Sequence, residues 1–396
     1  MIDRRNDAST LYIHAYASKA LLSNRFKQSP EDIEKLRFGL FGEVGGILAG
    51  VKKASRDRLG IALNKAIAEE LGDALWYLFA LSWSLAFDSE RIATMALEHI
   101  RADVGISGPL PGGPISFRHL DSTFQSTTSP EDGLQARVLS RMAQSAARLT
   151  VPTGEDERAC AVLLGDLAMV CGAFDDALED IARANLDKTN SRWPPKEDRV
   201  YGPHLDADSE KTYEQMPRQF DMLFEERQIH GRHFVVQSIK DVFIGDPLTD
   251  NHTGEDFYRF HDVFHLAYLA HLSWSPVLRA LMKRKRKSQP AKDENQDGAR
   301  AMIIEEGIAT WIFNHAQHDD VDFADIEVGA LPYSLLKQIA NMVEGYEVEV
   351  RPSWQWEQAI IDGFIMFRQL KTHRQGVIRV DMDHHTIEFF KRDELP

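Results

Sequence analysis

The chain has 396 residues, 43% of them apolar and 27% charged, and its 46 basic and 61 acidic side chains give a formal net charge of −15. This composition is typical of a soluble globular protein, and about 150 residues per domain suggests two or three domains. An excess of acids argues against nucleic-acid binding, which begins by neutralising phosphates. The start of the chain lacks the apolar run of a signal peptide, and no stretch approaches the about 20 apolar residues of a membrane span. We therefore expect a cytoplasmic protein.

The first half of the chain has apolar residues at helical spacing, which predicts an all-α fold. Ser29-Pro30-Glu31-Asp32 combines an N-cap, a proline at the first helical position and early acids, so it predicts a helix running to about Arg56. Further helices are predicted at about residues 61–87, 89–101, 134–149 and 155–192. The stretch 105–133 is rich in Gly, Pro and Ser and predicts a long loop, part of an insertion at about residues 102–135.

The second half begins with a polar, nonperiodic segment, residues 196–210. This segment predicts a domain boundary that separates residues 1–195 from residues 196–396. Helices are predicted at about residues 256–273, 275–287, 297–317, 331–344 and 353–373. The alternating stretch 377–390 predicts a small terminal β-hairpin. The predicted fold class is therefore all-α, a helical bundle followed by a second mainly helical domain that ends in a hairpin.

Two helices of the first half carry acids at helical spacing: Glu43 lies on one, and Glu69, Glu70 and Asp73 on the next. Glu70 and Asp73 are three residues apart and share one helix face, which is flanked by apolar residues. Acids beside an apolar stripe are costly unless positive charge lies between them, and Mg²⁺ prefers carboxylate oxygens. The alternative is that these acids are solvated at the edge of amphipathic helices.

The segments GLFGEVGGI, VKK, EELGDALWYL and IARANLDKTNSRWP resemble, in order and spacing, the MazG-like branch of the all-α nucleoside triphosphate pyrophosphohydrolases. The resemblance covers about residues 8–195. It implies Mg²⁺-dependent cleavage, with Mn²⁺ as a possible substitute, of a (d)NTP to the (d)NMP and pyrophosphate in nucleotide-pool control or defence. It also implies a homo-oligomer. The second glutamate of the family's ExxE motif falls on Gly46, which leaves open a nucleotide sensor that binds without turnover.

The resemblance also implies roles for individual residues. Four acids would be catalytic. Glu43, Glu70 and Asp73 would be metal ligands, and Glu69 would be a ligand, a supporting group or a base. Four further residues would bind the substrate: Lys52, Lys53, Asn185 and Lys188. Without the resemblance, each of these lysines could equally be a solvated surface charge.

The second half offers another possible site. His261 and His265 are four residues apart on a predicted helix, with Asp262 beside the first, and Glu305 and Glu306 could add oxygen ligands from another helix. Histidines on apolar helices are more often satisfied core or surface groups. A looser set permits a phosphohydrolase site of the HD type: His233, His261, Asp262 and Asp362.

Two patterns leave the second half more open. Arg37-Phe38 and Arg259-Phe260 each precede a basic cluster and a Glu-Glu helix, so this half could be a diverged relative of the first. The basic run 283–287 could be a phosphate site, or a helix end where positive charge complements the dipole.

Overall fold

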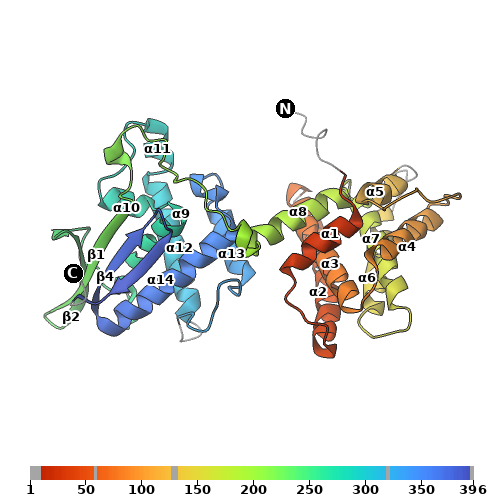
Figure 1. The fold of residues 1–396 in the computed structure, drawn as a ribbon, viewed down its shortest axis with the longest axis horizontal. Coiled ribbons are helices and arrows are strands. Elements are labelled where there is room, and N and C mark those ends of the chain that lie inside the picture. Colours follow the sequence, from red (N-terminus) through yellow and green to blue (C-terminus); the bar gives the residue numbers. More distant parts are fainter. Residues whose placement is uncertain (1–9, 58–59, 126–132, 318–321, 393–396) are drawn as a thin grey trace. The chain divides into compact units, whose positions relative to one another are not determined.

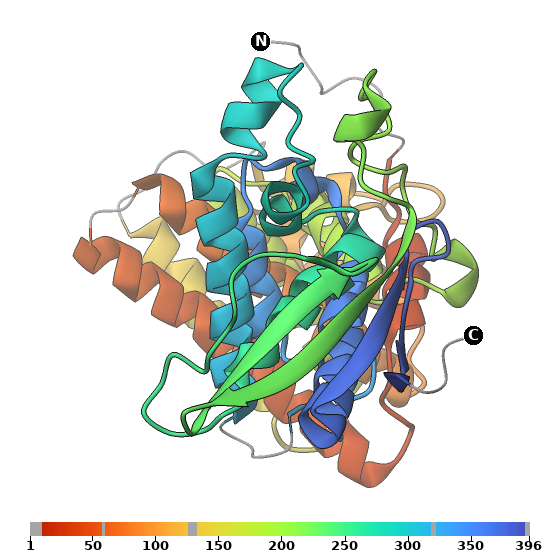
Figure 2. The ribbon, with the colours of Figure 1, turned by 90° about the vertical axis from the view of Figure 1, so that its left-hand side faces the viewer.

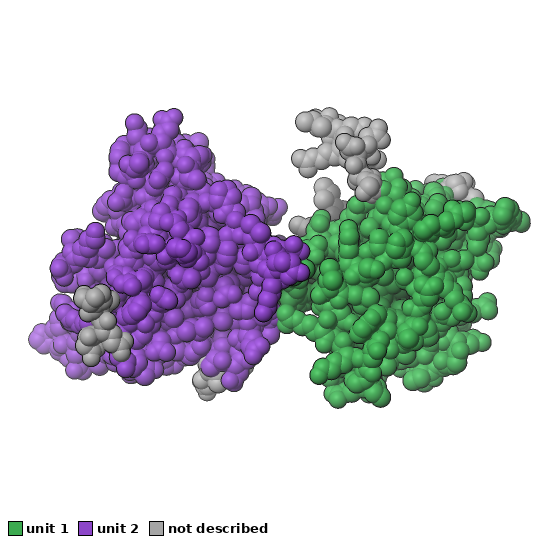
Figure 3. All heavy atoms as spheres, viewed as in Figure 1, with its two compact units in different colours: residues 1–195 green, residues 196–396 purple. Residues whose placement is uncertain are grey.

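The computed structural model describes residues 10–57, 60–125, 133–317 and 322–392. The chain forms two compact units, residues 1–195 (unit 1) and residues 196–396 (unit 2), coloured green and purple in Figure 3. Each unit has a hydrophobic core of its own. Across the described ranges, no helix combines the length and the apolar character that crossing a bilayer requires.

Unit 1 is a bundle of helices (Figure 1). Its helices are α1 (Ile13–Ala20), α2 (Pro30–Asp57), α3 (Gly60–Ser84), α4 (Ser89–Asp103), α5 (Phe117–Gln125), α6 (Leu134–Arg148), α7 (Asp156–Ala173) and α8 (Leu178–Arg192), with the short turn η1 (Leu21–Ser23). Helices α2 and α3 pack along each other, α4 and α6 pack on α7, and α8 packs on α3. The bundle therefore brings α2, α3 and α8, which carry the candidate residues of unit 1, into contact.

Buried polar groups fix the ends of these helices. The carboxylate of Asp121 accepts hydrogen bonds from the backbone N–H groups of Leu178 (2.9 Å) and Glu179 (3.1 Å), so it caps the start of α8. Arg37 of α2 is buried and donates to the Leu149 carbonyl (2.7 Å) and to Asp156 (2.6 Å). These bonds hold α2 and α8 against the rest of the bundle.

Two predictions for unit 1 differ from the structure. The single helix expected from Glu155 to Arg192 is two helices, because the chain turns between α7 and α8, where Asp175 has a positive φ of 60°. The stretch expected to be a loop contains α5, which buries Phe117 and Phe124. Its residues 126–132 lie outside the described ranges.

Unit 2 is built on a five-stranded antiparallel sheet of order β3-β2-β1-β4-β5. The strands are β1 (Gln219–Ile229), β2 (Arg232–Ile239), β3 (Val242–Phe243), β4 (Gln375–Asp381) and β5 (Thr386–Phe390). His230 and Gly231 join β1 to β2 with positive φ values of 52° and 76°, the backbone form of a two-residue type I′ hairpin.

Helices cover one face of this sheet. The helices of unit 2 are α9 (Asp262–Leu272), α10 (Pro276–Leu281), α11 (Pro290–Asn295), α12 (Ala299–Gln317), α13 (Tyr333–Met342) and α14 (Ser353–His373), with short turns η2 (Lys196–Asp198), η3 (Thr212–Glu214), η4 (Tyr258–Phe260) and η5 (Glu347–Val350). Helices α9 and α14 pack together and against the sheet, as Figure 2 shows for α14 behind the strands. Gly363 allows this close approach, because a Cβ there would lie 3.1 Å from the ring of Phe264. Helix α9 is therefore packed against both α14 and the sheet, and it also contacts α12.

The all-α prediction is correct in part, since the protein is mainly helical but contains this sheet. The predicted terminal hairpin is confirmed as β4 and β5, whereas β1, β2 and β3 were not predicted. In the described part of unit 1, the only strand-like pairing is an isolated bridge between Tyr12 and Ser116. The two units are therefore not copies of one fold.

Candidate functional site

The acids of unit 1 lie on helices that pack together, Glu43 on α2 and Glu69, Glu70 and Asp73 on α3. Lys188 of α8 reaches into this group, with its Nζ 2.6 and 2.8 Å from the two oxygens of Asp73 and 3.4 Å from Glu69. One cationic side chain therefore already faces the acids.

Asn185 supports Asp73 from inside the bundle. It is buried, its Nδ2 lies 3.4 Å from an oxygen of Asp73, and its Oδ1 accepts a hydrogen bond of 2.8 Å from the hydroxyl of Tyr16. Gly72 permits this contact, since a Cβ there would lie 3.1 Å from Asn185. Nothing in the sequence pattern had singled out Tyr16. The chain Tyr16, Asn185, Asp73 fixes one carboxylate of the group.

Negative charge is crowded at this site. Partial burial, the charge of Asp73 and a hydrogen bond with Glu70 raise the pKa of Glu43 to about 7. Burial also raises the pKa of Asp73, although Lys188 opposes the shift. Burial and the charge of Asp73 raise the pKa of Tyr16 well above its usual value. Lys188 alone thus leaves an excess of negative charge, which a divalent cation would neutralise.

Gly46 provides the space that Glu70 occupies. A Cβ built at Gly46 would lie 2.4 Å from Oε2 of Glu70 and 2.9 Å from its Cδ. The carboxylate of Glu70 therefore lies over the position where the resembled family has its second ExxE glutamate. Glycine at position 46, where the family has a glutamate, thus allows the Glu70 carboxylate to lie where it does.

The remaining candidate residues of unit 1, Lys52 and Lys53, are exposed on α2, beyond Glu43 along the helix. In the described part of the chain, the lysine that is paired with these acids is Lys188. Their role in substrate binding remains a prediction from the resemblance.

The crowding of acids predicts a pH dependence of local stability. The folded-state pKa of Glu43, about 7, exceeds its ordinary value of 4.5. The folded state therefore binds more protons between these values, and the stabilisation from protonated Glu43 is lost as the pH rises through about 7. Amide hydrogen exchange of α2 and α3 in EDTA should show Glu43→Gln more protected than wild type at pH 8 and equally protected at pH 4.5. A difference that does not grow with pH would contradict this explanation.

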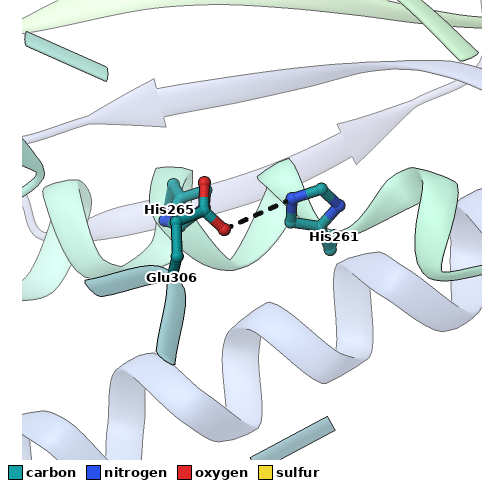
Figure 4. A group of neighbouring side chains, drawn as sticks. All are labelled: His261, His265 and Glu306. Atoms are coloured by element: carbon teal, nitrogen blue, oxygen red, sulfur yellow. Dashed lines mark ion pairs between the residues drawn. The ribbon is translucent and has the colours of Figure 1, made fainter. Parts of the chain in front are cut away.

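The second group lies in unit 2, where His261, His265 and Glu306 each offer one ligand atom within 4.8 Å of the others. His261 immediately precedes α9, His265 lies one turn later, and Glu306 comes from α12. Figure 4 shows the Glu306 carboxylate between the two imidazoles. Its Oε2 lies 3.6 Å from Nε2 of His261 and 3.5 Å from Nε2 of His265. These three residues could hold a metal ion.

The other predicted residues of this group surround the triad. Glu305 is fully buried and lies 2.8 Å from Nδ1 of His265, and its other oxygen accepts a 2.8 Å hydrogen bond from the backbone N–H of Val277. Asp262 lies 3.2 Å from Nε2 of His261 and accepts a 2.7 Å hydrogen bond from Gln237 of β2. The sequence did not indicate Gln237, whose contact depends on the unpredicted strand.

The carboxylates also control the charges of this group. Burial lowers the pKa of His265, but Glu305 and Glu306 outweigh it and hold that pKa well above the ordinary value. Burial would raise the pKa of Glu306, but its interactions with the two histidines hold it low. The triad thus combines the anionic carboxylate of Glu306 with two imidazoles. A metal ion that binds there would displace a proton from His265.

The HD-type set is not assembled. His233 lies near the start of β2, 3.4 Å from Glu226, and Asp362 of α14 pairs with His271 at 2.8 Å. Two residues of this set lie at the triad: His261 is one of its members, and Asp262 lies beside His261.

The basic run 283–287 follows the end of α10 at Leu281, and one of its cations belongs to the core of unit 2. Arg286 is fully buried between Asp297 and Glu347, with its closest oxygen 2.6 Å away in each. Lys283 and Lys287 are exposed. Arg286, the fourth residue of the run, is therefore structural.

Comparison with known proteins gives one family. Residues 201–393, nearly all of unit 2, match the MazG C-terminal domain. No curated protein and no solved structure matches the chain. The matched residues form the half of the chain whose function the sequence left open. The MazG-like interpretation of unit 1 rests on its own motifs.

Proposed function

We propose that the protein is a Mg²⁺-dependent pyrophosphohydrolase that cleaves a (d)NTP to the (d)NMP and pyrophosphate at the acids of unit 1. The observation that carries the proposal is the crowding of Glu43, Glu70 and Asp73, which raises the pKa of Glu43 to about 7. The MazG-like motifs of unit 1 and the MazG C-terminal domain match of unit 2 support it. Its biological role would be nucleotide-pool control or defence, and the same resemblance supports assembly as a homo-oligomer.

The donor set fits Mg²⁺, because all the candidate ligands are carboxylates on neighbouring helices. Glu43, Glu70 and Asp73 would hold the ion, with Mn²⁺ as a substitute. Bound Mg²⁺ supplies neutralisation of the phosphate charge and a water of lowered pKa.

The chain's own residues would position the substrate and a proton acceptor. Lys188, now paired with Asp73 and Glu69, would move its ammonium group to a phosphate oxygen when a cation takes its place. Asn185 and Tyr16 would keep Asp73 in place during this exchange. Glu69 would then accept a proton from the attacking water. Lys52 and Lys53 would meet the outer phosphates.

A panel of the separate NTPs and dNTPs tests the proposal. The full chain is incubated with each nucleotide and Mg²⁺, and the products are separated chromatographically. We expect the monophosphate and pyrophosphate in equal amounts, and no turnover in EDTA. Binding of a nucleotide without turnover of any would instead establish the sensor alternative. Release of inorganic phosphate and a diphosphate would contradict the proposed cleavage position.

Gly46 provides a test that separates activity from stability. Gly46→Ala should displace the Glu70 carboxylate, since the new Cβ would lie 2.4 Å from Oε2. Alanine is the better helix former by about 1 kcal/mol, so the fold should be as stable as wild type or more stable. We expect kcat to fall about tenfold or more with an unchanged or higher midpoint of urea unfolding.

Gly45→Ala is the matched control. It makes the same change one residue earlier on α2, where a Cβ would meet nothing within 4 Å. Its kcat should equal that of wild type. Equal rates for Gly45→Ala and Gly46→Ala would show that the position of Glu70 does not matter for turnover.

A further inference from the structure

The two histidines of the unit 2 triad are oriented for metal binding by their Nδ1 atoms. Nδ1 of His265 faces a carboxylate oxygen of Glu305 at 2.8 Å, and Nδ1 of His261 faces the Tyr258 carbonyl at 2.9 Å. Both partners are acceptors, so each Nδ1 carries the proton. Once a metal ion displaces the second proton of His265, which lies toward Glu306, each Nε2 presents a lone pair to the ion. This is the usual arrangement of metal-binding histidines whose other nitrogen donates to a carboxylate or a carbonyl.

Among the residues that the structure describes, Nε2 of His265 is a buried polar atom without a hydrogen-bond partner. The whole side chain is 0% exposed. Such atoms are rare in folded proteins, since an unsatisfied buried polar atom costs about 1–3 kcal/mol. This atom is aimed at Oε2 of Glu306, which is also the oxygen nearest Nε2 of His261.

The distances within the triad fit coordination better than hydrogen bonding. The separations of 3.5 and 3.6 Å between Glu306 and the two Nε2 atoms exceed the normal hydrogen-bond length. A tetrahedral ion about 2.0–2.1 Å from each ligand atom holds those atoms about 3.3 Å apart. The observed spacings are therefore close to the edge of a coordination tetrahedron.

Charge and access favour a cation at the same place. Glu305, Glu306 and Asp262 surround the histidines, and within the described ranges no lysine or arginine pairs with any of them. Glu305 is fully buried, whereas the side chain of Glu306 is 42% exposed, so the triad opens to solvent on the side of α12. An ion could enter there and leave one coordination position for water.

We propose that His261, His265 and Glu306 bind a first-row divalent transition metal ion such as Zn²⁺. Two imidazole nitrogens and one carboxylate suit such ions, whereas Mg²⁺ takes oxygen ligands. Glu305 positions His265, and Tyr258, stacked on the His261 ring at 4.2 Å, positions His261. Asp262, oriented by Gln237, adds negative charge beside the ion. This centre is built from residues of unit 2, and the inference does not depend on the proposed function.

The test uses metals alone on the full, untagged chain after removal of metals with a chelator. Calorimetry with Zn²⁺ should give one tight site per chain, and Co²⁺ should give the visible absorption of a low-symmetry nitrogen and oxygen site. His265→Ala should weaken Zn²⁺ binding about 100-fold or more. Glu306→Gln, at a partly exposed position that the fold tolerates, should also remove the Co²⁺ spectrum while circular dichroism stays unchanged.

His384→Ala is the matched control, because the side chain of that histidine is 73% exposed and pairs with Asp381, away from the triad. It should bind Zn²⁺ as wild type does. Glu305→Gln should weaken binding about 10–100-fold and shift the Co²⁺ spectrum, as expected of a positioning residue. Absence of a stoichiometric Zn²⁺ site in wild type, or equal binding by wild type and Glu306→Gln, would overturn the proposal.

Discussion

Asp73→Asn is expected to lower Mg²⁺-dependent turnover of nucleoside triphosphates roughly 100-fold or more. Asp73 has polar contacts with both Lys188 and Asn185. Asparagine keeps its shape and can still accept a hydrogen bond from Lys188, so the bundle should fold normally. It removes the negative charge that holds the cation, so kcat should fall and more Mg²⁺ should be needed for half-maximal rate.

Asp187→Asn is the control for this substitution. Asp187 is exposed and precedes Lys188 on α8, so the same change there leaves the acids untouched. Its steady-state rates should match those of wild type. A rate for Asp73→Asn within threefold of wild type, with unchanged circular dichroism, would exclude Asp73 as a metal ligand.

Arg286→Ala is expected to destabilise unit 2 by about 3–5 kcal/mol. The guanidinium contacts both oxygens of Asp297 and both of Glu347, and its Nη1 reaches the Leu205 carbonyl at 3.3 Å. Burial lowers the pKa of Arg286, but these carboxylates outweigh it and hold the pKa above its usual value. Removing the cation leaves the fully buried Asp297 without its principal partner.

Urea unfolding measures this loss. Lys287→Ala is the control, since Lys287 is exposed beside Arg286 and should change the free energy of unfolding by less than about 0.5 kcal/mol. A loss below about 1 kcal/mol for Arg286→Ala would mean that the buried pairs contribute little to the fold.

The helices were predictable because their signals are local. The start of α2 at Pro30 and the whole of α14 follow from capping residues and 3.6-residue spacing, and the β4–β5 hairpin follows from an alternating stretch with a polar centre. Strands β1 and β2 were missed although His230-Gly231 is a turn signal, since both strands carry charged residues at their exposed end. Their pairing depends on helices and strands far away in the sequence.

The sequence could predict which residues form the candidate sites, but it could not predict how their side chains are arranged. The spacing of His261 and His265 indicates a shared helix face, yet it cannot assign different roles to the adjacent Glu305 and Glu306. Neighbouring helical residues point about 100° apart, so packing decides which one lies at Nδ1 and which at Nε2 of His265. In the same way, packing alone pairs Lys188 with Asp73.

Turnover by Glu70→Gln and by His265→Ala, measured side by side with wild type, tests the central claim most directly. Both variants are assayed with the best nucleotide of the panel and Mg²⁺, by release of pyrophosphate. If the acids of unit 1 perform the chemistry, Glu70→Gln loses turnover and His265→Ala keeps it, even where His265→Ala no longer binds Zn²⁺. Loss of turnover in His265→Ala with wild-type rates in Glu70→Gln would contradict this account and place the reaction in unit 2.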